Sequence, residues 1–240
     1  MAYLRLVAIL VWFVLVCFLG LVLALFRWGD LNLDHDLARM FSWGMCGITR
    51  VTVLVEGEEW LAQHQPCIYV ANHQSAFDLA TFGRICPRRV IVIGKKELIW
   101  IPLFGLLFAA AGNIMIDRRR RDRAIAGLSQ AVEALRNRGA SIWLFPEGTR
   151  NTSGQGLLPF KKGAFHMAIA ASVPIVPVVS SPILPIVNWK EGRLGGGIVR
   201  LRVLPAVPTT GLDTADVDAL AARVREEMLD GQRGLVSEPT

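Results

Sequence analysis

A histidine and an aspartate stand five positions apart at the end of a short apolar run, in Asn72-His73-Gln74-Ser75-Ala76-Phe77-Asp78. On a regular helix, residues five apart lie roughly 140° from each other around the axis, so these side chains would not meet there. They meet if His73 lies on the loop that leaves a strand and Asp78 on the first turn of the next helix. Asp78 then orients the imidazole and stabilises the imidazolium. The spacing predicts a general base with an orienting acid, and a helix cap beside a structural histidine is the alternative.

A second polar segment, Phe145-Pro146-Glu147-Gly148-Thr149-Arg150, follows another apolar run. Gly, Thr and Arg on a turn are typical of an anion-binding loop. Neither segment contains an obvious nucleophile, and the chain has no G-x-S-x-G elbow, which disfavours a serine hydrolase. The chemistry that remains is a base that activates an incoming hydroxyl, without a covalent enzyme intermediate.

H-x-x-x-x-D followed by F-P-E-G-T-R resembles the glycerolipid acyltransferases, most closely the bacterial 1-acylglycerol-3-phosphate acyltransferases. The family's second block resembles Gly94-Lys95-Lys96-Glu97-Leu98 with Pro102, Gly105, Gly112 and Asp117-Arg118, and its fourth resembles residues 173–178. The four blocks occur in the family's order. Two departures, Asn151 where Ser is common and Gly94 where Ala is common, do not touch the expected chemistry.

The resemblance implies acyl transfer from a thioester, either acyl-CoA or acyl-carrier protein, to the hydroxyl of lysophosphatidic acid, with no further cofactor. His73 would be the base and Asp78 its partner. The residues implied to hold the glycerol phosphate are Glu147, Gly148, Thr149 and Arg150, with Lys95 and Arg118 as secondary contacts. A lyso-ornithine lipid or another lysophospholipid as acceptor, and a membrane phospholipid-binding protein without turnover, are the alternatives.

The N-terminal region is strongly apolar, in a chain of 240 residues that is 52% hydrophobic. Residues 6–26 carry no charge and are long enough, at roughly 30 Å, to cross a hydrocarbon core. Arg27-Trp28-Gly29-Asp30 is a poor cleavage site, so a removed signal peptide is disfavoured. A spanning helix and a helix lying in one leaflet both fit. The resemblance implies a two-helix membrane motif, with the second helix over about 33–55, at the cytoplasmic face of the inner membrane.

Positive charge is concentrated in one stretch of the chain, whose formal net charge is +6. Residues 84–123 hold ten Lys and Arg and three acidic residues. This stretch fits an anionic membrane surface or a phosphorylated substrate, with a solvated helix start as the alternative. No nucleic-acid-binding motif accompanies the charge. The four cysteines have no C-x-x-C spacing, which predicts free thiols in a reducing compartment, and the four histidines suggest no metal cluster.

From residue 66 onward the patterns of strands and helices alternate, which predicts an α/β domain with a mixed or parallel sheet flanked by helices. We divide the chain into membrane-associating helices at 1–60 and an acyltransferase domain at 61–240. Buried strands are expected at 67–71, 90–93, 114–116, 142–145 and 175–179, with a half-buried or edge strand at 199–203. Helices are expected at about 77–84, 97–111, 121–138, 162–171 and 213–228. The apolar stretch 98–111 fits core packing, an acyl-chain tunnel or a segment that dips into the bilayer.

Overall fold

The computed structural model describes residues 2–117, 120–153, 156–189 and 191–237. Their strands are β1 (Val51–Glu56), β2 (Ile68–Ala71), β3 (Val90–Lys95), β4 (Ile114–Ile116), β5 (Ser141–Leu144), β6 (Ile175–Ser180), β7 (Val187–Asn188), β8 (Arg193–Leu194) and β9 (Gly197–Val203). The helices are α1 (Ala2–Phe26), α2 (Leu33–Thr49), α3 (Trp60–Gln63), α4 (Asp78–Gly83), α5 (Phe104–Ala110), α6 (Arg121–Asn137), α7 (Gly163–Ala171) and α8 (Val217–Ser237), with 3-10 turns η1 (Lys96–Trp100) and η2 (Thr214–Asp216).

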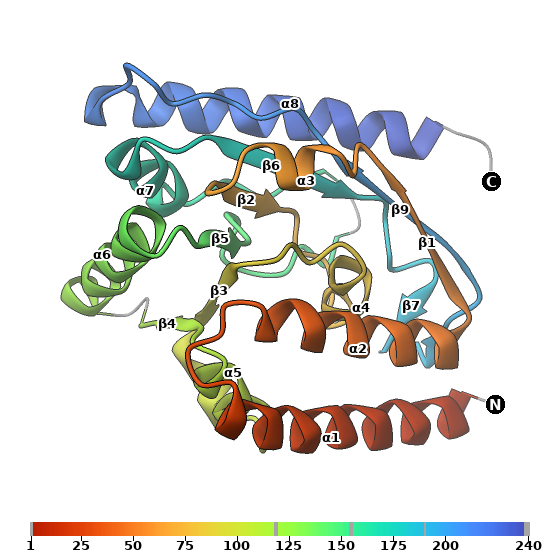
Figure 1. The fold of residues 1–240 in the computed structure, drawn as a ribbon. Helices are drawn as coiled ribbons and strands as arrows, with labels where there is room; N and C mark the ends of the chain where they lie inside the picture. The colour runs from red at the N-terminus through yellow and green to blue at the C-terminus, as the bar shows by residue number, and fades with distance from the viewer. Residues whose placement is uncertain (1, 118–119, 154–155, 190, 238–240) are drawn as a thin grey trace.

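Seven strands form one sheet in the order β1-β9-β6-β2-β5-β3-β4. The strands from β6 to β4 are parallel, β9 runs antiparallel to β6, and β1 runs parallel to β9. Helices cover both faces (Figure 1). The predicted α/β fold with a mixed, mainly parallel sheet is confirmed. The carboxyl ends of β2, β5 and β3 therefore meet at one edge of the sheet, which is where sites form in open α/β sheets.

Alternate residues of the central strands serve two separate cores. In β2, Tyr69 and Ala71 face the core that α1, α2 and α4 cover, whereas Ile68 and Val70 face the core beneath α6, α7 and α8. All four are buried. A strand buried on both faces reads as a continuous apolar run, and this explains why the sequence pattern located β2 correctly.

The second N-terminal helix is shorter than the sequence predicted. It ends at Thr49, because Arg50 takes a left-handed conformation with a φ of 57°. Residues 51–56 form strand β1, which pairs with β9 through its whole length. Valines alternate with other residues in Val51-Thr52-Val53-Leu54-Val55, a pattern that also fits a strand. The pairing with β9, distant in sequence, decides between the two structures, and it places β9 inside the sheet and β1 at its edge.

The predicted helix at 97–111 is broken in two. Pro102 and Leu103, whose φ is 62°, separate η1 from α5. The two pieces fold closely against each other at Gly105, where an added Cβ would lie 2.5 Å from backbone atoms of Ile99. Proline lacks the N–H that a continuous helix needs, which explains the break.

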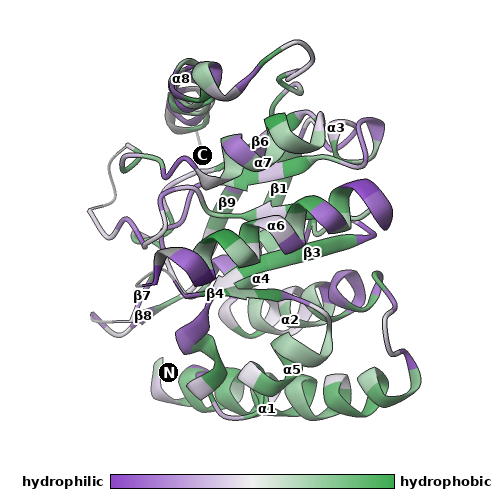
Figure 2. Ribbon diagram, turned by 90° about the vertical axis from the view of Figure 1, so that its left-hand side faces the viewer, coloured by the Kyte–Doolittle hydropathy of each residue, from purple (hydrophilic) through white to green (hydrophobic). Residues whose placement is uncertain are grey.

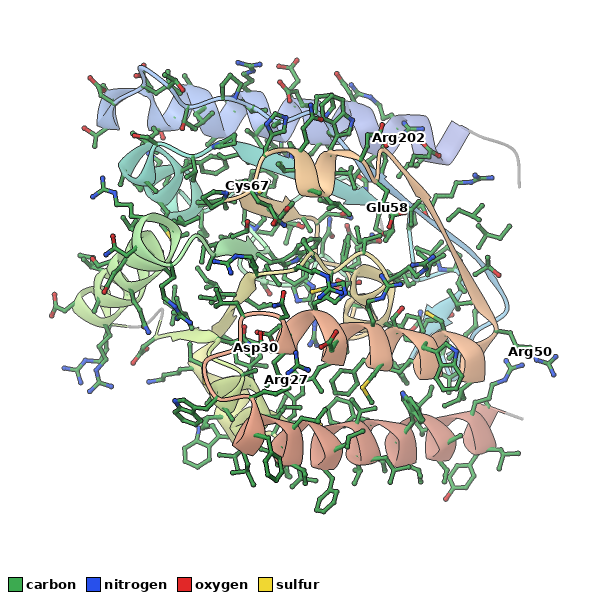
Figure 3. The ribbon with its side chains drawn as sticks, viewed as in Figure 1. Arg27, Asp30, Arg50, Glu58, Cys67 and Arg202 are labelled. Atoms are coloured by element: carbon green, nitrogen blue, oxygen red, sulfur yellow. The ribbon has the colours of Figure 1, made fainter. Side chains whose placement is uncertain are left out.

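Helix α1 lies alongside α2 and α5 at one end of the molecule (Figures 1 and 2). Its turn into α2 is held by Arg27, which pairs with Asp30 at 2.6 Å (Figure 3). Arg27 also pairs with Asp36 at 2.7 Å. Among the described helices, α1 alone is long and apolar enough to cross a bilayer, a property shared by core helices and signal sequences. The division of the chain at residue 60 stays a prediction.

Candidate active site

The structure brings His73 and Asp78 into contact. His73 lies on the loop that follows β2, and Asp78 is the first residue of α4. The imidazole Nδ1 lies 2.6 Å from Asp78 Oδ2, which also accepts backbone N–H bonds from Gln74 at 2.7 Å and Ser75 at 3.1 Å. A carboxylate with these bonds acts as an acceptor, so it places the ring proton on Nδ1 and leaves the lone pair on Nε2. This arrangement suits a general base.

Glu147 fixes the backbone of the same loop. Its side chain is buried, and Oε1 accepts the N–H of His73 at 2.8 Å while Oε2 accepts the N–H of Leu158 at 2.8 Å. Burial raises the pKa of this carboxyl, and the two backbone hydrogen bonds oppose that rise. Both oxygens are thus engaged inside the protein. Both oxygens face the backbone of His73 and Leu158, whereas the resemblance implied a contact with the glycerol phosphate, and that contact stays a prediction.

The imidazole of His73 lies flat against the ring of Phe145, with centroids 4.1 Å apart and planes 12° from parallel. Phe145 in turn packs against Phe82. The stacked rings hold the plane of the imidazole in place. The His73 side chain remains 20% exposed, which leaves it within reach of a substrate.

Two buried amides, whose role the sequence pattern does not indicate, tie the loop to the end of β6. Asn72 Oδ1 accepts the N–H of Ser180 at 2.8 Å, and its Nδ2 donates to the Ser180 carbonyl at 3.3 Å. Gln74 Nε2 donates to the Ser181 carbonyl at 3.1 Å, and Oε1 accepts the N–H of Ile183 at 3.2 Å. In the sequence, these residues are recognisable only as amides in a turn that follows a buried strand. That pattern does not predict which backbone groups they bind.

The loop after β5 runs beside His73. Asn151 donates its N–H to the His73 carbonyl at 2.7 Å, and Gly148 turns the chain with a φ of 72°. Thr149 and Arg150 are exposed on this loop. The structure therefore brings the loop that carries Thr149 and Arg150 beside the loop of His73, and the contact of these residues with phosphate stays a prediction.

Lys95, the last residue of β3, is exposed at the same edge of the sheet. Its neighbour Lys96 instead points to Asp117, with Nζ 2.6 Å from Oδ2. Arg118, the other secondary candidate, lies outside the described residues. A second cation, Arg123, approaches Asp117 at 3.7 Å.

Comparisons with known proteins show which proteins this chain is similar to. The sequence model of the family described as "Acyltransferase" matches residues 52–181. The chain is 37% identical to the 1-acyl-sn-glycerol-3-phosphate acyltransferase of Escherichia coli, over 93% of this chain and 90% of that protein. It is 45% identical to the human 1-acyl-sn-glycerol-3-phosphate acyltransferase alpha over 75% of this chain, and the match spans 63% of the human protein.

A solved structure shares the whole fold. The crystal structure of the 1-acyl-sn-glycerophosphate acyltransferase of Thermotoga maritima aligns with a TM-score of 0.79 and 26% identity, over 100% of both chains. That alignment includes the two N-terminal helices as well as the sheet. The resemblance stated from the sequence motifs is confirmed, and this chain belongs to the acyltransferase family.

Proposed function

We propose that this protein transfers an acyl group from an acyl thioester to the sn-2 hydroxyl of 1-acylglycerol-3-phosphate, which yields phosphatidic acid for phospholipid synthesis. The observation that carries the proposal is the 2.6 Å contact between His73 and buried Asp78 beside the exposed Arg150 loop. The names of the similar proteins support this acceptor over a lyso-ornithine lipid.

In the proposed mechanism, Nε2 of His73 removes the proton of the acceptor hydroxyl as its oxygen attacks the thioester carbonyl. The new ester bond forms, the C–S bond breaks, and the proton passes from His73 to the departing thiolate. A thioester is already activated, so the base addresses the remaining difficulty, an alcohol that does not ionise near neutral pH. Such a base is typically worth about 10²–10⁴-fold.

Each neighbouring residue has a separate part in this proposal. Asp78 orients the ring, and Glu147 is a positioning residue that holds the backbone of His73. The acceptor phosphate binds to Arg150, whose planar guanidinium fits two phosphate oxygens at once. Gly148 and Thr149 shape this loop, Lys95 adds a cation at the same edge, and Arg118 is retained from the resemblance alone.

We propose further that α1 lies in one leaflet of the membrane. The residues on its inner face are buried against the body, including Ile9, Val16 and Gly20, so the helix follows the protein surface along its length. Its outer face exposes large apolar side chains, among them Leu10, Leu15 and Phe18. Trp100 and Leu106, in the predicted bilayer-dipping segment, extend this exposed apolar surface.

The sheet and its edge then stand above the membrane, with the reaction on the cytoplasmic side, which four free cysteines support. Part of the basic stretch, above all Lys95 at the edge of the sheet, faces the substrate or the anionic membrane surface. Strand β1 belongs to the sheet, so we assign residues 51–60 to the acyltransferase domain in this proposal.

A donor and acceptor panel tests the proposal. Purified full-length protein in detergent is assayed with lysophosphatidic acid or a lyso-ornithine lipid as acceptor, and with acyl-CoA or acyl-carrier protein as donor. We expect phosphatidic acid from lysophosphatidic acid and its loss in Asp78→Asn, which removes the charge that stabilises the imidazolium. If no acceptor is acylated by the folded protein, it is a lipid-binding protein without turnover.

A further inference from the structure

A groove of about 710 Å³ opens beside the exposed side of α2, away from the residues assigned to the reaction. Helix α1, the end of α4 and the start of β1 form its other walls. Apolar side chains of Trp12, Met40 and Trp43 line one part, and the cations Arg39 and Arg84 line another. Cys46 also lines it. This combination of apolar and cationic walls suits an amphipathic ligand.

The two arginines carry a charge that the groove does not balance. Both are exposed, and Nη1 of Arg39 donates to the backbone carbonyl of Arg84 at 3.2 Å, which brings α2 and the end of α4 together. Among the described residues that line the groove, none is acidic. Asp36, three positions before Arg39, pairs with Arg27 at 2.7 Å. A phosphate group would supply the missing negative charge and match the guanidinium geometry.

The apolar part of the groove begins at α1. The Trp12 indole donates to the Met40 carbonyl at 3.1 Å and lies 5.4 Å from the ring of Trp43. Gly44 makes room for Trp12, because an added Cβ would lie 2.1 Å from its ring. Trp43 is 75% exposed. Tryptophans gather at the membrane–water interface, so Trp12 and Trp43 suit the level of the lipid headgroups.

We propose that this groove binds one anionic glycerophospholipid of the surrounding bilayer as an intact ligand. Its phosphate lies between Arg39 and Arg84, and the glycerol end of an acyl chain lies against Trp12, Met40 and Trp43. The inference rests on the proposed position of α1 in one leaflet and not on acyl transfer. A zwitterionic lipid is a poorer fit, because its ammonium group meets two cations and no acid.

Native mass spectrometry of the full-length protein released from detergent micelles counts the lipids that each molecule retains. With phosphatidylglycerol at low mole fraction, we expect one retained lipid, and little retention of phosphatidylcholine under the same conditions. The double variant R39Q/R84Q should weaken retention by at least about tenfold, since it removes the charge-assisted hydrogen bonds to the phosphate.

A matched variant controls for bulk charge. R88Q/R138Q removes two exposed arginines that do not line the groove, and it should leave retention unchanged. Equal loss in both variants, unchanged retention in R39Q/R84Q, or equal retention of phosphatidylcholine would each overturn the proposal. Thermal unfolding checks the fold of every variant, and R84Q alone replaces the double variant if that protein is unstable.

Alkylation of Cys46 gives a second, independent measurement. Burial raises the pKa of this thiol, so the reaction with N-ethylmaleimide is run at mildly alkaline pH and followed by peptide mapping. Phosphatidylglycerol should slow the modification of Cys46 in the natural protein and have no such effect in R39Q/R84Q. Equal protection in the two proteins would show that the lipid binds elsewhere.

Discussion

The edge of the sheet that carries His73, here called the site edge, differs from the outer face of α1. Polar groups at the site edge are hydrogen-bonded within the protein, whereas apolar groups on α1 are exposed. Around His73, buried carboxylates and amides find partners within the chain: Asp78 Oδ2 accepts two backbone N–H bonds, and each oxygen of Glu147 accepts one. On α1, large side chains such as Phe18 and Phe26 are exposed and apolar. Figure 2 shows this helix as a continuous hydrophobic element at one end of the molecule.

The site edge is therefore stabilised by contacts within the protein, whereas the outer face of α1 depends on contact with its surroundings. A buried polar group costs free energy unless it is hydrogen-bonded, so the loops at the site edge are fixed by the fold. A large exposed apolar surface is stable only against another apolar phase, such as a membrane. Changes at the site should therefore alter rate, and changes on α1 should alter location.

The largest effect should come from His73→Ala, which removes the proposed base. Turnover should fall by at least about 10²-fold, because general-base catalysis is worth about 10²–10⁴-fold. The measurement is phosphatidic acid formation by purified enzyme, with thermal unfolding and membrane association both unchanged. Retention of more than about a tenth of the rate by a folded variant would contradict the assignment of the base.

The second-largest effect, on membrane attachment, should come from charges introduced on the outer face of α1. The double variant Leu15→Asp/Phe18→Asp alters two exposed side chains, 55% and 63% accessible, near the middle of the helix. Each charge costs at most about 2.5–3.5 kcal/mol, the value for the centre of a spanning helix, because a helix in one leaflet lies closer to the headgroups. Membrane fractionation should show release of this variant, while its activity on detergent-dispersed lysolipid persists.

The matched control for this comparison is Leu15→Ala/Phe18→Ala, which keeps the surface uncharged and should remain with the membrane. The natural protein should also resist a wash in about 1 M salt, where the Debye length is about 3 Å. Release of the natural protein by that wash would mean that its attachment is electrostatic and that the apolar surface plays another part.

A smaller effect is expected from Arg150→Ala. Loss of a hydrogen bond to a charged group costs about 1.5–3 kcal/mol, which corresponds to a rise of roughly 10- to 150-fold in the KM for the acceptor. Steady-state kinetics should show little change in the KM for the donor. An effect confined to the donor would assign Arg150 to the thioester substrate, and Arg88→Ala is the control for a lost surface charge.

The smallest effect should come from Glu147→Gln. The amide keeps the size of the side chain but turns an N–H towards one of the two backbone donors, so one donor loses its acceptor. The expected cost is about 1–3 kcal/mol in the free energy of unfolding, with a lower kcat because the loop of His73 loosens. Urea unfolding and turnover measure the two effects.

The pH dependence of the stability of Glu147→Gln tests whether titration of the buried carboxyl contributes to the stability of the natural protein. Burial raises the pKa of Glu147 in the folded protein above its ordinary value of 4.5. A raised pKa contributes stability that is present below the unfolded value and lost as pH rises through the folded value. The natural protein should lose this part of its stability from about pH 4 upward, and the neutral glutamine variant should not. If the curves of stability against pH run parallel for the two proteins, the Glu147 carboxyl does not titrate in this pH range.

The sequence predicted the elements whose signal is local. A run of buried residues marked β2, and turn-forming residues before Asp78 marked the start of α4, so the contact between His73 and Asp78 was predictable. The pattern also placed α6 and β4 correctly. In contrast, the residues after Thr49 fit a helix and a strand equally well, and the pairing with β9 decides between them.

Within the site, the type of each residue was predictable but its direction was not. Glu147 belongs to a motif whose resemblance implied a phosphate contact, yet it faces inward to the backbone of His73 and Leu158. Adjacent lysines show the same limit, because Lys96 pairs with Asp117 while Lys95 is exposed. The direction of each side chain depends on which residues of other strands and loops pack beside it.

The sequence by itself determined the α/β class, the contact between His73 and Asp78 and an apolar N-terminal helix. These follow from periodicity, spacing and composition, which are properties of contiguous residues. Only the tertiary structure decided that Glu147 is buried, that Asn72 and Gln74 tie the loop to β6, and that α1 packs along the protein with one apolar face uncovered. Each of these depends on contacts between segments far apart in the chain, and burial and hydrogen-bond partners are set by those contacts.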